Sequence, residues 1–71
     1  MKTLHELMQA VGGGRYVSGL LGVSESAVSR WCCGLAIPRR HRYAIAVLLN
    51  KSQKEIIESQ IHFLRKSKEN L

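Results

Sequence analysis

Residues 13–31 read GGRYVSGLLGVSESAVSRW, and this stretch decides the fold. Apolar residues at helical spacing lie on both sides of Gly22, and glycine is suited to the left-handed conformation just past a helix end. Ser24 follows as a residue that can cap the next helix. The stretch therefore predicts two short helices, at residues 15–21 and 24–33, joined by a tight turn.

The residues of these two helices divide into a core set and an exposed set. Helices that meet at about 90–120° need a small residue at the crossing, and Ser18 supplies it. The angle between the helices is filled by apolar side chains, namely Val17, Leu21, Val23, Val28 and Trp31. The exposed set on the second helix is small, polar or basic and is suited to base edges in a major groove; its members are Glu25, Ser26, Ser29 and Arg30.

The chain of 71 residues is basic, with eleven Lys and Arg, five Asp and Glu, and a formal net charge of +6. Between residues 15 and 42 there are five arginines and one glutamate, so +4 of that +6 lies in this segment. A localised basic segment indicates a polyanionic partner, usually nucleic acid. Arg39, Arg40 and Arg42 follow Pro38 at the expected start of a helix, where free N–H groups and cations together favour phosphate. A solvated charged face is the alternative interpretation.

Three further helices complete the prediction. The capping-box pattern TLHE opens a helix at residues 4–11, and SQKE opens another at residues 52–66, followed by a charged end that we expect to fray. A proline start favours a helix at residues 38–49, although its run YAIAVLL is also typical of a buried strand. We place Tyr43 in the core. The predicted fold class is all-α, with residues 1–71 forming one compact bundle of about five short helices that contains a helix-turn-helix.

The central segment resembles the helix-turn-helix of the lambdoid phage Cro and repressor proteins. The runs LGVS and AVS and the tryptophan that follows them match the family pattern as they stand. The similarity continues through the IP dipeptide and the fourth helix, so that it covers residues 13–49. Two departures stand out: Ser18 replaces the usual Ala, and Gly13 and Gly14 stand where the family often has Gln or Thr. At the second departure only backbone N–H groups are left to contact phosphate.

The resemblance implies a sequence-specific regulator of transcription that binds double-stranded DNA. It makes residues 24–33 the recognition helix, with base contacts from Glu25, Ser26, Ser29 and Arg30. The phosphate contacts that we expect are Arg15, Ser24, Arg39, Arg40 and Arg42. Two alternatives stay open, since Glu25 also suits a helix dipole and Arg30 also suits a phosphate.

The resemblance also implies a dimer, because one helix-turn-helix reads only a few base pairs and proteins of this family bind a palindromic operator as two copies. We assign the interface to the predicted helix 52–66, which has more apolar surface than one side of a terminal helix needs. The interface residues are Ile57, Ile61 and Leu64, with Ile56 and Phe63 beside them. The alternative is that all five cover the core of the first four helices.

The leading functional hypothesis is a Cro-like repressor, and two others stay open. The pattern SRW…IP…AVL also resembles a phage lysogeny activator with the same DNA-binding fold. A helical protein-interaction module that works through its fifth helix is the alternative from another class. The sequence offers no nucleophile–base pair, paired carboxylates or metal-ligand cluster, so we expect no enzymatic activity, metal, cofactor or small-molecule substrate.

The cysteines and the apolar runs indicate a cytoplasmic protein. Cys32 and Cys33 are adjacent, a spacing that rarely gives a disulfide and does not match a zinc site, so we expect both to be reduced. The start MKTLHELM has no long apolar run of the kind found in signal peptides. No segment approaches the ~18 apolar residues of a membrane span, and we expect no membrane partner.

Overall fold

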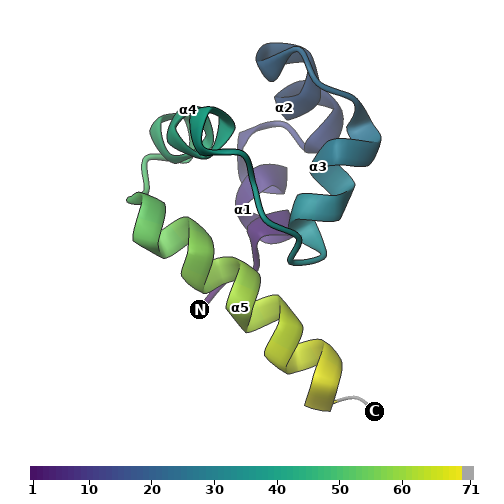
Figure 1. Ribbon diagram of the computed structural model, residues 1–71, viewed down its shortest axis with the longest axis vertical. Coiled ribbons are helices and arrows are strands. Elements are labelled where there is room, and N and C mark those ends of the chain that lie inside the picture. Colours follow the sequence, from purple (N-terminus) through teal and green to yellow (C-terminus); the bar gives the residue numbers. More distant parts are fainter. Residues whose placement is uncertain (70–71) are drawn as a thin grey trace.

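Five helices and no strand make up the described part of the chain, residues 1–69, in this computed structural model (Figure 1). The helices are α1 Leu4–Val11, α2 Gly14–Leu21, α3 Glu25–Cys32, α4 Arg39–Leu49 and α5 Gln53–Glu69. The predicted all-α class is confirmed, and the run YAIAVLL is helical rather than a strand. None of the helices within residues 1–69 combines the length and the apolar character needed to cross a membrane.

The predicted capping boxes form at the starts of two helices. Before α1 the Thr3 hydroxyl accepts from the Glu6 N–H at 3.3 Å, and the Glu6 carboxylate accepts from the Thr3 N–H at 3.0 Å. Ser52 and Glu55 exchange the same two bonds before α5, at 3.1 Å each. The bond from the backbone N–H is the main reason why the pKa of each carboxyl group lies below its ordinary value.

Tyr43 is not in the core, so its predicted position was wrong. It is 64% exposed, and Val47, one turn later on the same face of α4, is equally exposed. The inward face of α4 instead carries Ile45, Ala46 and Leu49, which pack into the core. The run YAIAVLL is apolar all round, and contact with the other helices decides which of its sides is buried.

Several helix ends differ from the prediction, and those of α4 and α5 are the most informative. Pro38 lies just outside α4 in an extended conformation, and its carbonyl accepts hydrogen bonds from two N–H groups of the first turn, at 2.9 and 3.0 Å. α5 continues to Glu69, so the charged end that we expected to fray is helical. Lys66 and Lys68 in its last turn complement the negative end of the helix dipole, which favours the longer helix.

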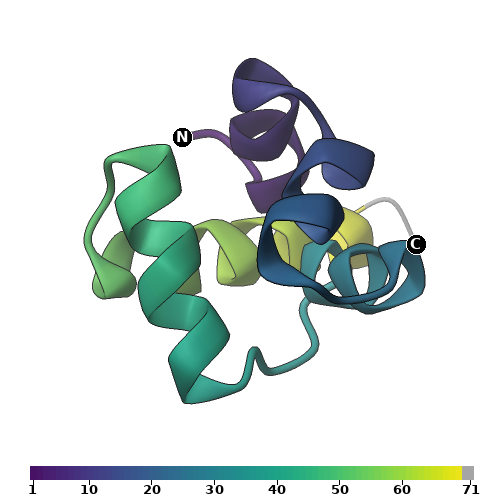
Figure 2. The same cartoon turned by 90° about the horizontal axis from the view of Figure 1, so that it is seen from above.

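α1 is the centre of the fold, because it contacts all four other helices. Leu4 and Met8 on its inward face are almost completely buried. Figures 1 and 2 show α4 on one side of α1, α2 and α3 on the other, and α5 crossing beneath both groups. The buried apolar residues are Leu4, Met8, Val17, Val28, Trp31, Cys32, Ile37, Ile45, Ala46, Leu49 and Ile56.

A buried glutamine ties α5 to the end of α3. Gln60 is 7% exposed, and its Nε2 donates to the carbonyls of Trp31 and Leu35, each at 2.9 Å. The chain turns there at Gly34, whose φ is +100° and where a Cβ atom would lie 2.7 Å from the Leu64 side chain. α5 therefore fixes the end of α3 both by hydrogen bonds and by close packing.

We expect Trp31→Ala to destabilise the fold by about 3–5 kcal/mol, because the buried indole would leave a cavity. Urea denaturation followed by circular dichroism measures the free energy of unfolding. Val47→Ala is the control, since this exposed side chain should contribute less than about 0.5 kcal/mol. A Trp31→Ala chain as stable as the parent would contradict the burial of the indole.

Candidate nucleic-acid interface

α2 and α3 are consecutive helices that pack against each other across a short turn. Gly22 ends α2 in the left-handed conformation, with φ 69° and ψ 33°, as predicted. The Ser24 hydroxyl accepts from the Ala27 N–H at 3.1 Å and caps α3. Ser18 is buried, and its hydroxyl donates to the Arg15 carbonyl at 2.8 Å. A left-handed glycine, a capped start and a small buried residue together set how α3 follows α2.

α3 has a buried side and an exposed side. Val28 and Trp31 are buried, as predicted, and Cys32 is buried beside them. The predicted base-contact residues Glu25, Ser26, Ser29 and Arg30 are all exposed. The exposed side of α3 therefore carries two short serines between one acidic and one basic residue, so that another molecule can approach its backbone closely at the serines.

A groove of about 570 Å³ joins the exposed side of α3 to the start of α2. Glu25 and Ser29 line it from α3, and Arg15 lines it from α2. α2 follows Gly13, which has a φ of 90° and provides no side-chain cap, so the first N–H groups of α2 have no side-chain partner among the described residues. The fold thus brings Arg15 into one groove with two of the predicted base-contact residues.

The arginine-rich start of α4 is held near the last turn of α3. The ring centroids of Trp31 and His41 lie 5.7 Å apart, with an interplanar angle of 34°. Arg39 and Arg40 are exposed, and Pro38 provides no side-chain cap. Guanidinium groups and uncapped N–H groups therefore occur together at this helix end.

Arg42 is less exposed than Arg39 and Arg40. It is half-buried, and its Nε donates to Gln53 Oε1 at 3.2 Å. Since Gln53 begins α5, this guanidinium is held against the turn between α4 and α5. Arg39 and Arg40 are thus the freely exposed members of the predicted phosphate contacts on α4.

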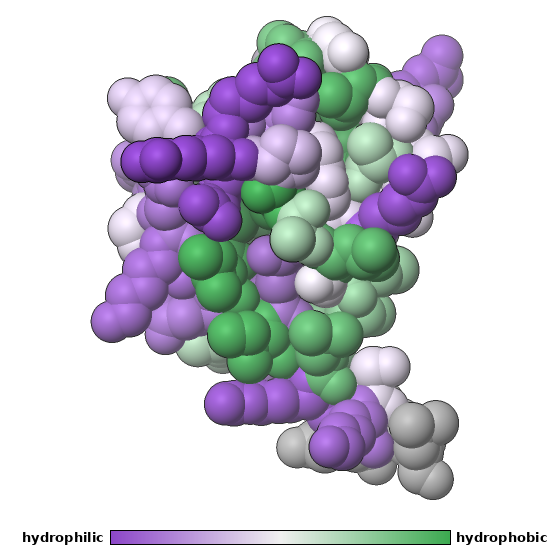
Figure 3. All heavy atoms as spheres, viewed as in Figure 1, coloured by the Kyte–Doolittle hydropathy of each residue, from purple (hydrophilic) through white to green (hydrophobic). Residues whose placement is uncertain are grey.

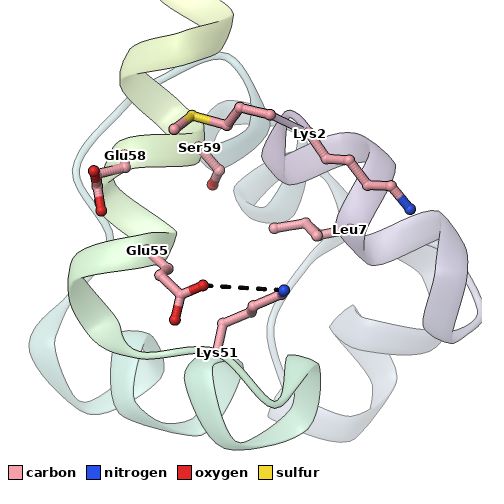
Figure 4. Close-up of a pocket in the computed structure, with 7 residues that line it drawn as sticks. Lys2, Leu7, Lys51, Glu55, Glu58 and Ser59 are labelled. Atoms are coloured by element: carbon pink, nitrogen blue, oxygen red, sulfur yellow. Dashed lines mark ion pairs between the residues drawn. The ribbon is translucent and has the colours of Figure 1, made fainter.

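The predicted DNA-contacting arginines have no carboxylate within 4.0 Å among the side chains that the structure describes. The one ion pair there joins Lys51 and Glu55 at 4.0 Å, beside a pocket of about 410 Å³ between α5 and the first residues (Figure 4). Lys2 and Glu58 also line that pocket, so both signs of charge meet in it. In the same part of the chain, no group of three His, Cys, Asp or Glu is placed to hold a metal ion.

The predicted dimer residues form an apolar stripe on α5. Ile57, Ile61 and Leu64 are 39%, 41% and 47% exposed, and we call these three the α5 stripe. Ile56 is completely buried and is part of the core, as the alternative prediction for the apolar residues of α5 requires. It is the one residue of the five that is completely buried. Leu35, which is also exposed, adds apolar surface from the loop that α5 binds. Figure 3 shows apolar atoms gathered over α5 and over the loop after α3.

Sequence reasoning missed the contribution of α1 to the groove beside α3. His5 and Gln9 line this groove, and the Gln9 amide lies 3.5 Å from the place that a Cβ atom of Gly13 would occupy. These two polar residues are four positions apart on the side of α1 that does not carry Leu4 and Met8. Their spacing was the only available signal.

Comparisons with known proteins leave the interface to be interpreted from its own geometry. No protein-family model matches the chain, and no curated protein or solved structure matches it significantly.

We expect the adjacent cysteines to react differently with thiol reagents. Burial raises the pKa of the Cys32 thiol to about 11, and its Sγ lies 3.6 Å from Met8 Sδ, whereas Cys33 is exposed. At about pH 7.5, N-ethylmaleimide should add once to the folded chain, at Cys33, because the thiolate is the reacting form. Peptide mass spectrometry locates the adduct, and the urea-unfolded chain, as control, should be labelled at both positions. Equal labelling in the folded chain would contradict this difference.

Proposed function

We propose that the chain is a sequence-specific regulator of transcription that binds double-stranded DNA through α3. The observation that carries the proposal is the division of α3 into a packed side and an exposed side that presents two short serines, one carboxylate and one guanidinium. Arginines with no ion pair among the described side chains lie at the start of α2, which packs on α3, and at the start of α4, where the His41 ring lies 5.7 Å from that of Trp31. This combination is what a helix in the major groove requires: base-reading groups in the centre and phosphate-binding groups on the flanks.

α3 suits the major groove in size and chemistry. The groove is about 12 Å wide, which admits one α-helix. Ser26 and Ser29 have short side chains, so the helix can approach the base edges closely. Arg30 can donate two hydrogen bonds to guanine O6 and N7, and Glu25 can accept from a cytosine amino group.

The phosphate contacts come from two helix starts. At the start of α2, the backbone N–H groups after Gly13 and the Arg15 guanidinium bind phosphates of the DNA strand that runs beside α3. The Ser24 hydroxyl accepts the hydrogen bond that caps α3, and its own hydrogen can still be donated to a phosphate. At the start of α4, Arg39 and Arg40 bind a second group of phosphates. Arg42 contributes less to this binding, because its Nε already donates to Gln53. These groups fix the position of α3 without reading sequence.

We further propose that the regulator acts as a homodimer on a palindromic operator, with the α5 stripe as the interface. A two-fold interface uses the same patch on both subunits and must be apolar and separate from the reading helix. The α5 stripe is partly exposed and lies on a helix whose end projects beyond the rest of the fold in Figure 1. In keeping with the resemblance to the Cro family, the bound dimer represses by covering its operator.

Arg39→Ala and Arg40→Ala should each weaken binding to operator and to random DNA by similar factors. The slope of log affinity against log salt concentration should fall by about 0.9 for each lost phosphate contact. Arg42→Ala should change the slope less, and Lys54→Ala, which removes an exposed cation elsewhere, is the control. Fluorescence anisotropy over a salt series measures the slopes. Unchanged slopes for both arginine variants would rule out the phosphate contacts on α4.

Arg30→Ala should lose discrimination rather than general affinity. Selection of bound duplexes from a random pool first identifies the operator, which we expect to be palindromic with half-sites about 34–36 Å apart. The variant should then distinguish operator from random DNA less well by about 1–3 kcal/mol, the value of one bidentate base contact. Gel shifts on both DNAs measure the difference. A parallel loss on the two DNAs would show that Arg30 contacts phosphate instead.

Ile61→Lys should give a folded monomer with weakened operator binding, because a charge in the middle of the α5 stripe opposes its burial between subunits. Analytical ultracentrifugation measures the mass, and circular dichroism measures the fold. Leu20→Lys is the matched control, since Leu20 is an exposed apolar residue of α2, and this variant should remain a dimer. An unfolded Ile61→Lys chain would favour the core alternative, and a folded dimer would exclude this interface.

A further inference from the structure

The outer face of α4 carries an apolar pair that the proposed DNA contacts do not use. Tyr43 and Val47 lie one turn apart, and each is 64% exposed. A groove of about 550 Å³ runs from this pair to the turn between α4 and α5, where Asn50, Ser52 and Gln53 line it. We call this the α4 groove.

The α4 groove is held by a fixed turn. Asn50 ends α4 in the left-handed conformation, with φ 55° and ψ 45°, and the Lys51 N–H donates to the Ala46 carbonyl at 2.9 Å. The reciprocal hydrogen bonds of Ser52 and Glu55 fix the next residues. A partner can therefore bind without first ordering this turn, which lowers the entropy cost of binding.

The surroundings of the α4 groove are mainly cationic, because the carboxylate nearest to its lining, Glu55, already accepts from the Ser52 N–H and pairs with Lys51 at 4.0 Å. The sequence contains no Asp or Glu between Ser26 and Lys54, whereas Arg39 and Arg40 precede Tyr43 by about one helical turn. The Arg42 guanidinium is anchored beside the groove by its bond to Gln53, and it has no ion pair among the side chains that the structure describes. An anchored guanidinium loses little freedom when its remaining N–H groups pair with a carboxylate.

We propose that the α4 groove docks a segment of a partner protein in which a large apolar side chain stands next to carboxylates. The apolar side chain covers Tyr43 and Val47, and a carboxylate pairs with Arg42. A second copy of this chain is a poor occupant, because a two-fold contact brings the same cationic patch against itself. Duplex DNA satisfies the cations but leaves the apolar pair uncovered. This inference shares Arg42 with the proposed phosphate contacts, but it does not require that the chain binds DNA.

Selection from random peptides displayed on phage tests the proposal. The immobilised full chain is the target, and the Val47→Asp chain is used for counter-selection. The recovered peptides should share Leu or Phe next to Asp or Glu. For one such synthetic peptide, fluorescence anisotropy should show a Kd that rises about tenfold with Arg42→Gln and with Val47→Asp, as expected for loss of a charge-assisted pair or of the apolar contact. Leu20→Asp, on the exposed face of α2, should leave the Kd unchanged.

Circular dichroism checks the folding of each variant, and Tyr43→Ser replaces Val47→Asp if the latter unfolds. Peptides that lack acidic residues, or equal affinity for the parent chain and Val47→Asp, would overturn the proposal. A change from dimer to monomer in Val47→Asp would also overturn it, by assigning the α4 groove to a second copy. Because the measurement contains no DNA, its outcome is separate from the outcome for DNA binding.

Discussion

The placement of Trp31 is the constraint on which the rest of the structure depends. Its indole is buried under α3 and lies against the ring of His41 in α4, while its carbonyl accepts from Gln60 in α5. Trp31 thus links α3, α4 and α5. The other element that all three of these helices contact is α1, at the centre of the fold. A chain of this size has a small core, so few other contacts can replace this link. The end of α3, the start of α4 and the middle of α5 take their relative positions from it.

Local patterns predicted the helices because the interactions that begin and end them are local. The bonds of the two capping boxes span three residues, and the left-handed Gly22 closes its own helix. Tyr43 was placed wrongly because α4 is apolar on more than one side, and the choice of inward face belongs to its packing against α1 and α5. Local periodicity carries no information on that choice.

Contacts between distant parts of the chain could not be predicted. The Gln60–Trp31 bond spans 29 residues, and the Arg42–Gln53 bond spans 11. A glutamine in a polar helix gives no sign in sequence that it will be buried. At the candidate site the exposed side of α3 followed from helical spacing alone. The groove that joins this side to Arg15 did not, because it depends on the packing of α1, α2 and α3 and on Phe63 of α5, which also lines it.

The exposed side of α3 also bears on how such a chain can evolve. The side chains of Ser26, Ser29 and Arg30 form no hydrogen bond or ion pair with the rest of residues 1–69, so the fold does not rely on them. Substitutions other than Gly and Pro at these positions cost little stability, since the helix propensities of ordinary residues span about 0.7 kcal/mol and Arg30 adds only a surface contact with the helix dipole. If α3 reads DNA as proposed, descendants of this chain can drift to new operators one residue at a time, without passing through unfolded intermediates.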